Sequence, residues 1–285
     1  MKRIEIKKIN DCDNYIGENP KKEHYDILIK EPTMFTMNGE IVAFYDKLPD
    51  NLIEKAADIS ISTKSSKSWR QGSGVPTMSS VFGALPKNEA RRMNSCRPAK
   101  KNAKELNNFK TIVTIAEKIA ELYKSKMPIN YEEDLQTVKE IVNEDYLIKE
   151  LPFTTFNANK NQIIRYHRDR GNVKGVMSNV LISRYGVSGG ELVFPEYRFA
   201  LAQEDGFYSV FNGEKEIHGV ADCEFLAQDA YRCSFVFYTL EQMKHCKSYF
   251  EEMKSEKETL TQKNINRKKT FGLTKEEFSK GNWKK

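Results

Sequence analysis

A series of short segments in the second half of the chain most constrains its fold, because each has the residue pattern of a β-strand and no helical pattern lies between them. Turn signals rich in Gly and Asn separate the segments, for example at 159–161, 170–172 and 212–213. Eight short strands in succession predict an all-β sandwich or barrel, and we expect a jelly roll, or double-stranded β-helix. The expected strands are 153–157, 162–167, 177–183, 191–194, 197–201, 206–211, 217–220 and 231–239.

The first half of the chain has a different pattern, with apolar residues at helical spacing over 103–126 and 131–142. We expect these helices to pack on the outside of one sheet. Short strands at 25–30 and 41–45, and a helix over 50–57 capped by Asp50, are expected before them. The predicted class is mainly β with flanking helices. One domain spans 1–246, with its core at about 150–246.

The last segment, 247–285, is expected to be a basic tail outside this domain. It has helical propensity but little apolar periodicity. A surface helix, a disordered arm and a weak electrostatic anchor all agree with this composition.

Two histidines and one aspartate inside the strand-rich region form a candidate metal-binding set. His167 and Asp169 are two residues apart, and residues i and i+2 of a strand point to the same face, so one strand can present both to one metal. His218 follows 51 residues after His167, and we expect it on a strand adjacent in space. Two imidazoles and one carboxylate are the ligand set of the facial triad that holds non-heme Fe(II) and leaves positions open for chemistry.

Arg232 lies 14 residues after His218, in a segment that resembles a strand. Its planar guanidinium suits a bidentate pairing with a carboxylate that is not a metal ligand. An iron site followed by such an arginine is typical of an oxygenase that uses 2-oxoglutarate as cosubstrate. A structural β-sandwich in which His167 and His218 are only core residues is the alternative, but it leaves the order of these residues unexplained.

Positive charge is concentrated between Lys64 and Lys104, where ten Lys or Arg accompany one acid, Glu89. The net charge of the whole chain is only +6. The stretch is also rich in Ser and Gly, and we expect a basic loop whose backbone can come close to phosphate groups. A solvated surface loop explains the same composition, but the candidate iron site in the same chain favours nucleic acid.

Five cysteines are scattered through the chain without a Cys-x-x-Cys pair. Their odd number and this pattern argue against a disulfide framework or a zinc knuckle and indicate a reducing compartment. No apolar run approaches the length of a membrane span, and the first residues lack the apolar core of a signal peptide. We therefore expect a cytoplasmic monomer that does not bind membranes, in the host cytoplasm if its source is viral, or in the nucleus if its source is eukaryotic.

Several segments resemble the TET/JBP family, Fe(II)/2-oxoglutarate dioxygenases that oxidise the 5-methyl group of thymine or 5-methylcytosine in DNA. The resemblance runs from about Ser79 to Tyr238 and is densest after Phe153. It is carried by Ser-Ser-Val-Phe-Gly at 79–83, Phe-Thr-Thr-Phe at 153–156, His-Arg-Asp at 167–169, Ser-Gly-Gly-Glu-Leu-Val-Phe-Pro at 188–195 and Arg-x-Ser-Phe-Val at 232–236.

The resemblance implies a role for each residue of the candidate site. His167, Asp169 and His218 would bind iron. Arg232 would pair with the distal carboxylate of 2-oxoglutarate, assisted by Ser234. The implied cofactors are Fe(II) and 2-oxoglutarate, with O2 as cosubstrate.

The resemblance also implies a pyrimidine base near the iron, and such a base cannot reach a metal from inside a duplex. It must be flipped out or presented on a single strand. Trp69, Phe82 and Tyr166 are candidates to stack on it, and packing in the core is the other interpretation of each. Asn172, three residues after the metal aspartate as in TET-like proteins, is a candidate base contact. A left-handed turn residue beside Gly171 is the other interpretation of this asparagine.

The chain departs from the animal TET pattern in two respects. It lacks the cysteine-rich zinc region, so it should not need structural zinc. It also lacks an obvious separate DNA-binding domain, so the stretch 64–104 would have to contact DNA. The candidate contacts are Arg70, Arg91, Arg92 and Arg97.

The sequence therefore predicts a dioxygenase that hydroxylates the 5-methyl group of a pyrimidine in DNA. A hydroxylase of a protein side chain or a small molecule would have the same iron site. A non-catalytic nucleic-acid-binding protein on the same scaffold is a third hypothesis, and the intact ligand set argues against it. Turnover of 2-oxoglutarate tests the third hypothesis, and stimulation of that turnover by DNA separates the first two. Thymine or 5-methylcytosine, single or double strand, and the extent of oxidation stay open.

Overall fold

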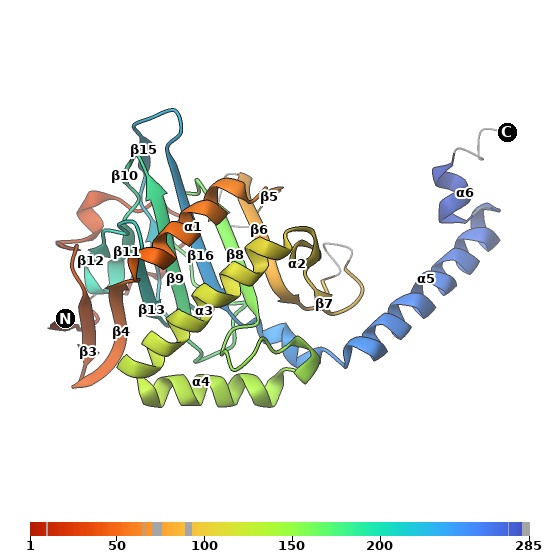
Figure 1. The fold of residues 1–285 in the computed structure, drawn as a ribbon, viewed down its shortest axis with the longest axis horizontal. Helices are drawn as coiled ribbons and strands as arrows, with labels where there is room; N and C mark the ends of the chain where they lie inside the picture. The colour runs from red at the N-terminus through yellow and green to blue at the C-terminus, as the bar shows by residue number, and fades with distance from the viewer. Residues whose placement is uncertain (10, 65, 70–75, 89–92, 273, 281–285) are drawn as a thin grey trace.

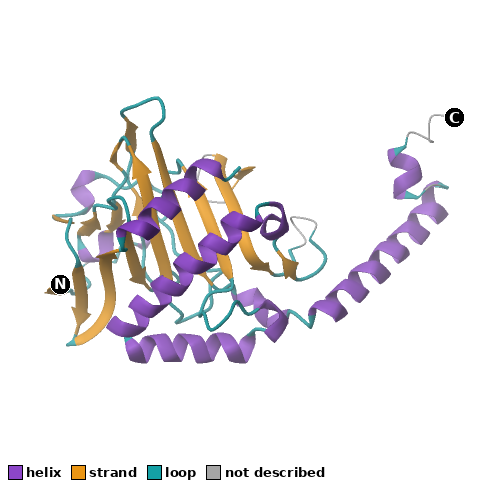
Figure 2. Cartoon of the chain, viewed as in Figure 1, coloured by secondary structure: helices purple, strands orange, loops and turns teal. Residues whose placement is uncertain are grey.

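The computed structural model describes residues 1–9, 11–64, 66–69, 76–88, 93–272 and 274–280. Over these residues the body consists of a ten-stranded sheet, a four-stranded sheet and a separate pair of strands, with helices against one face of the large sheet (Figures 1 and 2). The two sheets pack through a cluster of buried apolar residues that includes Phe35, Phe194 and Phe211. The chain is thus mainly β with flanking helices, as predicted.

The large sheet combines strands from both halves of the chain. Its order is β1, β3, β4, β13, β9, β16, β8, β6 and β5, with β7 paired to β6. The bounds are β1 (Lys2–Glu5), β3 (Thr33–Met37), β4 (Glu40–Lys47), β13 (Phe207–Phe211), β9 (Ser178–Tyr185), β16 (Tyr231–Tyr238), β8 (Thr155–Lys160), β6 (Pro76–Leu85), β5 (Ser66–Trp69) and β7 (Arg97–Pro98).

The small sheet has the order β14, β11, β12 and β2, and β10 pairs with β15 apart from it. Their bounds are β14 (Gly219–Val220), β11 (Leu192–Phe194), β12 (Phe199–Leu201), β2 (Ile27–Ile29), β10 (Val187–Gly189) and β15 (Cys223–Phe225).

The helices are α1 (Asp50–Ser62), α2 (Lys100–Lys104), α3 (Leu106–Lys126), α4 (Pro128–Ile141), α5 (Tyr249–Phe271) and α6 (Lys275–Ser279). The two longest expected helices are confirmed as α3 and α4. The expected cap of α1 is wrong, because Pro49 takes the cap position and Asp50 is the first helical residue. Within the described residues, no helix is both long and apolar enough to cross a membrane.

Alternate side chains of the central strands face either an apolar cluster or a cavity. On β16, Cys233, Phe235 and Phe237 face the apolar cluster beneath α1 and α3. The intervening residues of the same strand line a cavity on the opposite face of the sheet. Because successive side chains of a strand point to opposite faces, one strand both anchors the helical layer and supplies the cavity floor.

The predicted core at about 150–246 is too narrow, because β3, β4, β5 and β6 belong to the same sheet as the strands of that region. The interpretation of 64–104 as a loop is also wrong for most of its described residues, which form β5, β6, β7 and α2. The reason is that the middle of this stretch is apolar: Phe82 and Ala84 on β6 are buried. All of its charged residues lie outside that strand.

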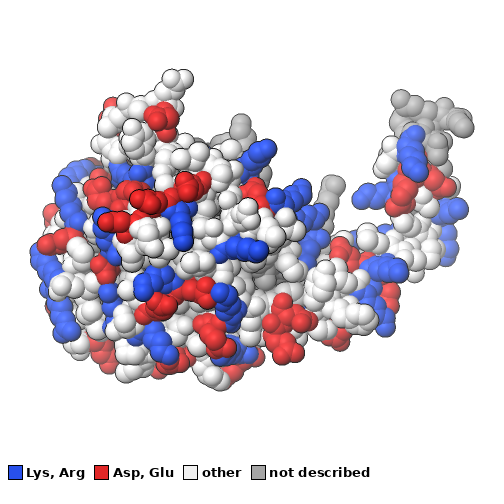
Figure 3. Space-filling model, viewed as in Figure 1, with Lys and Arg blue, Asp and Glu red and all other residues white. Residues whose placement is uncertain are grey.

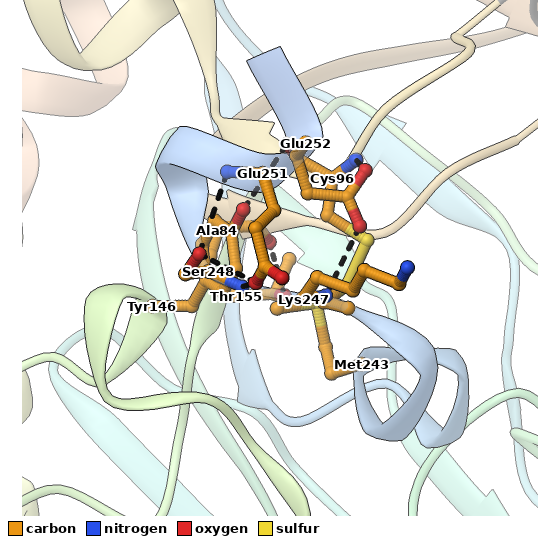
Figure 4. The surroundings of a disulfide bond; sticks show 10 residues. Ala84, Cys96, Tyr146, Thr155, Met243, Lys247, Ser248, Glu251 and Glu252 are labelled. Atoms are coloured by element: carbon orange, nitrogen blue, oxygen red, sulfur yellow. Dashed lines mark hydrogen bonds between the residues drawn. A yellow bond between two sulfur atoms is a disulfide. The ribbon is translucent and has the colours of Figure 1, made fainter. Parts of the chain in front are cut away.

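A disulfide joins Cys96 to Cys246, residues 150 positions apart (Figure 4). This bond runs against the expectation drawn from the cysteine pattern, whereas Cys12, Cys223 and Cys233 are free. The prediction failed because pairing depends on the fold, which brings the segment before β7 next to the segment after β16. The bond lies against Tyr146 and Met243 in a buried apolar cluster. The cytoplasmic location stays a prediction.

Removing this disulfide should lower the free energy of unfolding by about 2–5 kcal/mol, because the bond closes a very long loop in the unfolded chain. Urea titration of a Cys96→Ser/Cys246→Ser variant measures the loss. The wild type in dithiothreitol should unfold at the same urea concentration as the variant in the absence of reductant. If reductant leaves the midpoint of the wild type unchanged, the bond does not form in solution.

Candidate metal centre

A cavity of about 530 Å³ lies between the large and small sheets. The large sheet contributes residues of β6, β8, β9 and β16, and the small sheet contributes Leu192 and Val220. The three predicted metal ligands and Arg232 all line this one cavity. The fold therefore brings together residues that are up to 65 positions apart in the sequence.

His167, Asp169 and His218 converge on one point. Each offers one ligand atom, and these atoms all lie within 4.8 Å of one another. The Nε2 atom of His167 is 3.4 Å from Oδ1 of Asp169, and the Nε2 atom of His218 is 3.8 Å from Oδ2 of the same carboxylate. Two nitrogen donors and one carboxylate at this spacing fit a facial triad for non-heme Fe(II).

Backbone hydrogen bonds set the position of the three ligands. His167 and His218 form an isolated bridge, in which each backbone N–H donates to the carbonyl of the other residue. The backbone N–H of Asp169 donates to Gly213 O at 2.8 Å. The expected regular strand over 162–167 is wrong, because this segment makes only that bridge. His167 and Asp169 share a site by local bends rather than by strand alternation.

Both imidazoles are oriented through the nitrogen that does not face the site. Nδ1–H of His167 donates to Arg165 O at 2.8 Å, and Nδ1–H of His218 donates to Glu216 O at 2.9 Å. With the proton held on Nδ1, each Nε2 keeps its lone pair for a metal. Such an orienting hydrogen bond is usual for metal-binding histidines.

His218 is already in the state that a metal requires. Burial, and then the neighbouring His167, lower the pKa of His218 to about 4. The ring is therefore neutral at physiological pH and need not lose a proton before it binds a metal.

Glu196 supports the segment that carries His218. It is completely buried, and its Oε2 accepts a hydrogen bond from the backbone N–H of Ile217 at 3.1 Å. Its other oxygen pairs with Arg168 at 3.4 Å and with Lys8. Arg168 also donates to Lys215 O at 2.8 Å, so it joins the His167 segment to the His218 segment.

Arg232 is a buried cation without a matching anion. It is 2% exposed, and no carboxylate of the described chain lies within salt-bridge distance of it. One terminal nitrogen donates to Gly190 O at 3.3 Å, and Nε has no partner among the described residues. Burial lowers the pKa of the Arg232 guanidinium. A buried charge of this kind is costly unless it is paired, so the carboxylate of a bound cosubstrate fits here.

Arg184 lies opposite Arg232 on the neighbouring strand β9, but its guanidinium already donates to backbone carbonyls. It donates to the carbonyls of Gly189 and Gln203 at 3.0 and 3.3 Å, and to that of Val187. Arg232 is therefore the better partner for a cosubstrate carboxylate.

Ser234 lines the cavity two residues after Arg232, on the same face of β16. Its neighbours across the sheet are Asn159 on β8 and then Ser79 on β6. All three side chains are buried and line the cavity, so they form a polar row on its floor beside the arginine. Gln203 also lines the cavity, and its Nε2 lacks a partner among the described residues.

Asn172 lines the cavity close to the metal ligands, and its side-chain amide donates to Ser178 Oγ at 3.1 Å. Its backbone is not left-handed, so the interpretation as a left-handed turn residue is wrong. The stacking role expected for Phe82 and Tyr166 is also wrong. Both are buried in apolar clusters away from the cavity. The side chain of Trp69, the third stacking candidate, lies outside the described residues.

Of the four predicted DNA contacts, Arg70, Arg91 and Arg92 lie outside the described residues. Arg97 is described, and it faces α5 rather than open solvent: its guanidinium is 3.8 Å from the carboxylate of Glu256. A role for Arg97 as a free phosphate contact is not supported by this position.

The structure adds two basic residues that sequence reasoning missed. Arg165 and Arg170 flank the His-Arg-Asp motif and line the cavity, and Arg170 is exposed. Their position next to the metal ligands in the sequence was the signal that could have identified them. They place positive charge at the opening of the site.

The chain matches the family model Tet_JBP, described as the oxygenase domain of the 2OGFeDO superfamily, over residues 84–241. A comparison with curated protein sequences found no match.

Solved structures with a similar fold include the NgTET1 protein in complex with 5mC DNA, with a TM-score of 0.58 and 16% identity over 84% of this chain and 89% of that one. A 2OG-Fe(II) oxygenase family oxidoreductase from Burkholderia pseudomallei has a TM-score of 0.41 and 12% identity over 68% and 84%. OsALKBH1 has a TM-score of 0.39 and 10% identity over 66% and 91%. The family match and the first likeness confirm the predicted jelly-roll oxygenase fold.

Proposed function

Because the chain belongs to the TET/JBP family of Fe(II)/2-oxoglutarate oxygenases, we propose that it hydroxylates the 5-methyl group of a pyrimidine in DNA, either 5-methylcytosine or thymine. The family itself confirms the predicted enzyme class and cofactors: the protein is a dioxygenase that uses Fe(II) and 2-oxoglutarate. The DNA substrate is the proposed part.

The residues of the cavity account for the chemistry that this class performs. Bound Fe(II), with 2-oxoglutarate and O2, supplies an oxidant strong enough to hydroxylate a methyl group. His167, His218 and Asp169 would hold the metal. Arg232 would fix the distal carboxylate of 2-oxoglutarate by a forked hydrogen-bond pair. The walls formed by Leu192 and other apolar side chains limit access of water to the reacting atoms.

The observation that carries the DNA substrate is the position of arginines at the opening of this cavity. Arg165 and Arg170 lie beside the metal ligands, where the phosphates that flank an extruded nucleotide would pass. A cavity of about 530 Å³ is also within the size range of small-molecule sites and has room for more than a small dicarboxylate. The structural likeness to NgTET1, which was solved with 5mC DNA, supports the same substrate class.

A methyl group inside a duplex cannot approach a metal at the base of such a cavity, so the target base must leave the stack. Asn172 lies beside the ligands and can hydrogen-bond to the polar edge of a base if its amide turns from Ser178. We propose it as the residue that contacts the flipped base.

The direct test is incubation of the protein with Fe(II), 2-oxoglutarate and DNA that contains either 5-methylcytosine or thymine as its methylated pyrimidine. Mass spectrometry of the nucleosides should then detect the hydroxymethyl product of one of them. An Asp169→Ala variant is the control for adventitious oxidation. Turnover of 2-oxoglutarate that DNA does not stimulate, with no modified nucleoside, would support a protein or small-molecule substrate.

Replacing Arg165 and Arg170 with Gln should weaken DNA binding and lower the slope of log affinity against log salt by about 2, because each lost phosphate contact lowers the slope by roughly 1. Fluorescence anisotropy of a labelled duplex at several salt concentrations measures both quantities.

The matched control is the Lys55→Gln/Lys110→Gln variant. It loses the same amount of charge, but on the helices that cover the other face of the large sheet. Both lysines are exposed on α1 and α3, away from the cavity. The control should bind DNA as the wild type does. Equal slopes for all three proteins would show that the arginines at the opening do not contact phosphate.

A further inference from the structure

Helix α5 leaves the body of the molecule and extends away from it as an arm (Figure 1). Its 23 residues include none of the members of the four apolar core clusters of the described chain. At about 1.5 Å per residue, the helix is about 35 Å long. The helix therefore contributes nothing to the apolar core of the described body.

The first turns of α5 are nevertheless fixed firmly. Ser248 and Glu251 form a capping box, and the Cys96–Cys246 bond lies just before them (Figure 4). Glu252 accepts a hydrogen bond from the backbone N–H of Cys96 at 3.1 Å, and Glu256 accepts one from Ser95 at 2.8 Å. These contacts set the direction in which the arm leaves the body.

The root of the arm is close to the opening of the catalytic cavity. Arg97, which pairs with Glu256 at 3.8 Å, lies on β7 opposite Leu85 of β6. Leu85 lines the cavity. A ligand that extends from the cavity past β6 and β7 therefore reaches the base of α5.

Charge is divided along the arm. The first ten residues carry four Glu and two Lys, and two of the Glu contact the body. Residues 259–285 carry eight Lys or Arg and two Glu, a net charge of +6 that equals the net charge of the whole chain. Residues 1–258 are thus neutral overall. Figure 3 shows blue basic side chains along the outer part of the arm, with a few red acidic ones beside them.

The helical period places part of this charge on the side of α5 that contacts the body. Glu252, Glu256 and Lys263 follow one another at intervals of four and seven residues, which keeps them on one helical face. The face that is acidic where it meets the body becomes basic beyond it. Lys268 and Lys269 add exposed charge on the neighbouring faces.

We infer that the outer half of α5 is a second contact site for the DNA backbone, separate from the catalytic cavity. This inference rests on the proposed function. A duplex whose target base enters the cavity would continue past β7 and lie along the basic outer half of the arm. Polyanionic phosphate complements the charge of Lys263, Lys268 and Lys269. The arm adds affinity without reading sequence, because it contacts only phosphates.

The geometry predicts a dependence on DNA length. Lys263 lies about 20 Å along the helix from its first residue, and Lys269 about 30 Å. With a rise of about 3.4 Å per base pair, DNA must extend roughly 6–9 base pairs beyond the root of the arm to meet these lysines. A duplex of about 12 base pairs with a central target is too short, and one of about 30 base pairs is long enough.

The test compares the wild type with a Lys263→Gln/Lys268→Gln/Lys269→Gln variant on these two duplexes over a range of salt concentrations. On the long duplex, three lost phosphate contacts should lower the slope of log affinity against log salt by about 2.7. When salt rises fourfold, the affinity of the variant should therefore fall by a factor that is about 40 times smaller than for the wild type. The slope on the short duplex should not change. A Lys55→Gln/Lys110→Gln/Lys118→Gln variant, with the same charge change on α1 and α3, is the control.

Helical content by circular dichroism and DNA-free turnover of 2-oxoglutarate should be the same in all three proteins. The inference is supported if only the arm variant loses the additional affinity for the long duplex. It is overturned if the arm variant keeps both the wild-type slope and the preference for the long duplex. Absence of salt-dependent binding to either duplex by the wild type would contradict the proposed function as well, so the two failures are distinguishable.

Discussion

Each of the single variants His167→Ala, Asp169→Ala and His218→Ala should reduce hydroxylation to background and abolish tight binding of Fe(II). The ligand atoms lie within 4.8 Å of one another, so loss of one leaves an incomplete site. His167 and Asp169 are partly exposed and lie outside the apolar clusters, so these two variants should unfold close to the wild-type temperature. Metal binding by equilibrium dialysis, thermal unfolding and product formation should be measured on the same samples.

His218 needs a second variant, because its ring packs against Phe211 and Phe194 with centroids 5.0 and 6.3 Å apart. The His218→Gln substitution keeps more of the volume and should also lose activity. His245→Ala is the matched control, since His245 is exposed and is not part of the cavity lining. Near-wild-type turnover in any of the three ligand variants would show that the residue does not bind the metal.

The residues of the metal site could be predicted from the sequence, because the site has only a few chemical requirements. The set His167, Asp169, His218 and Arg232 is defined by ligand chemistry and by the need for a cationic partner of a carboxylate. Their convergence in one cavity is a tertiary outcome that the structure provides. The prediction that His167 and Asp169 lie on one regular strand was wrong. An isolated bridge and a bend position these residues instead.

The supporting residues could not be predicted, because their roles exist only in the folded chain. Glu196 resembles any surface acid in the sequence, yet it is buried against the backbone of Ile217. Cys96 and Cys246 gave no pairing signal, since 150 residues separate them. Arg97 resembled a phosphate contact until the structure placed Glu256 beside it.

The fold shows the same division between local and long-range information. Helices α3 and α4 follow from apolar residues at helical spacing, and the later strands follow from their turns. The position of β6 in the sheet could not be predicted, because its partner β8 begins about 70 residues later in the sequence. Strand pairing at this distance depends on complementary faces across the sheet, and a single sequence does not reveal them.

The Arg232→Lys variant should raise the concentration of 2-oxoglutarate needed for half-maximal turnover by about 10- to 150-fold. A lysine cannot form the forked pair with a carboxylate, and a hydrogen bond to a charged group contributes on the order of 1.5–3 kcal/mol. The structure strengthens this expectation, because Arg232 is 2% exposed and its Nε lacks a partner in the described chain. Fe(II) affinity should not change, since the arginine is not one of the clustered metal donors.

Arg184→Lys is the matched control for that variant. Arg184 donates to backbone carbonyls, so its loss should lower the unfolding temperature and leave the 2-oxoglutarate requirement within about twofold of wild type, a change below 0.5 kcal/mol. Steady-state kinetics in 2-oxoglutarate and thermal unfolding separate the two outcomes. If instead Arg184→Lys raises the requirement and Arg232→Lys does not, Arg184 and not Arg232 binds the cosubstrate carboxylate.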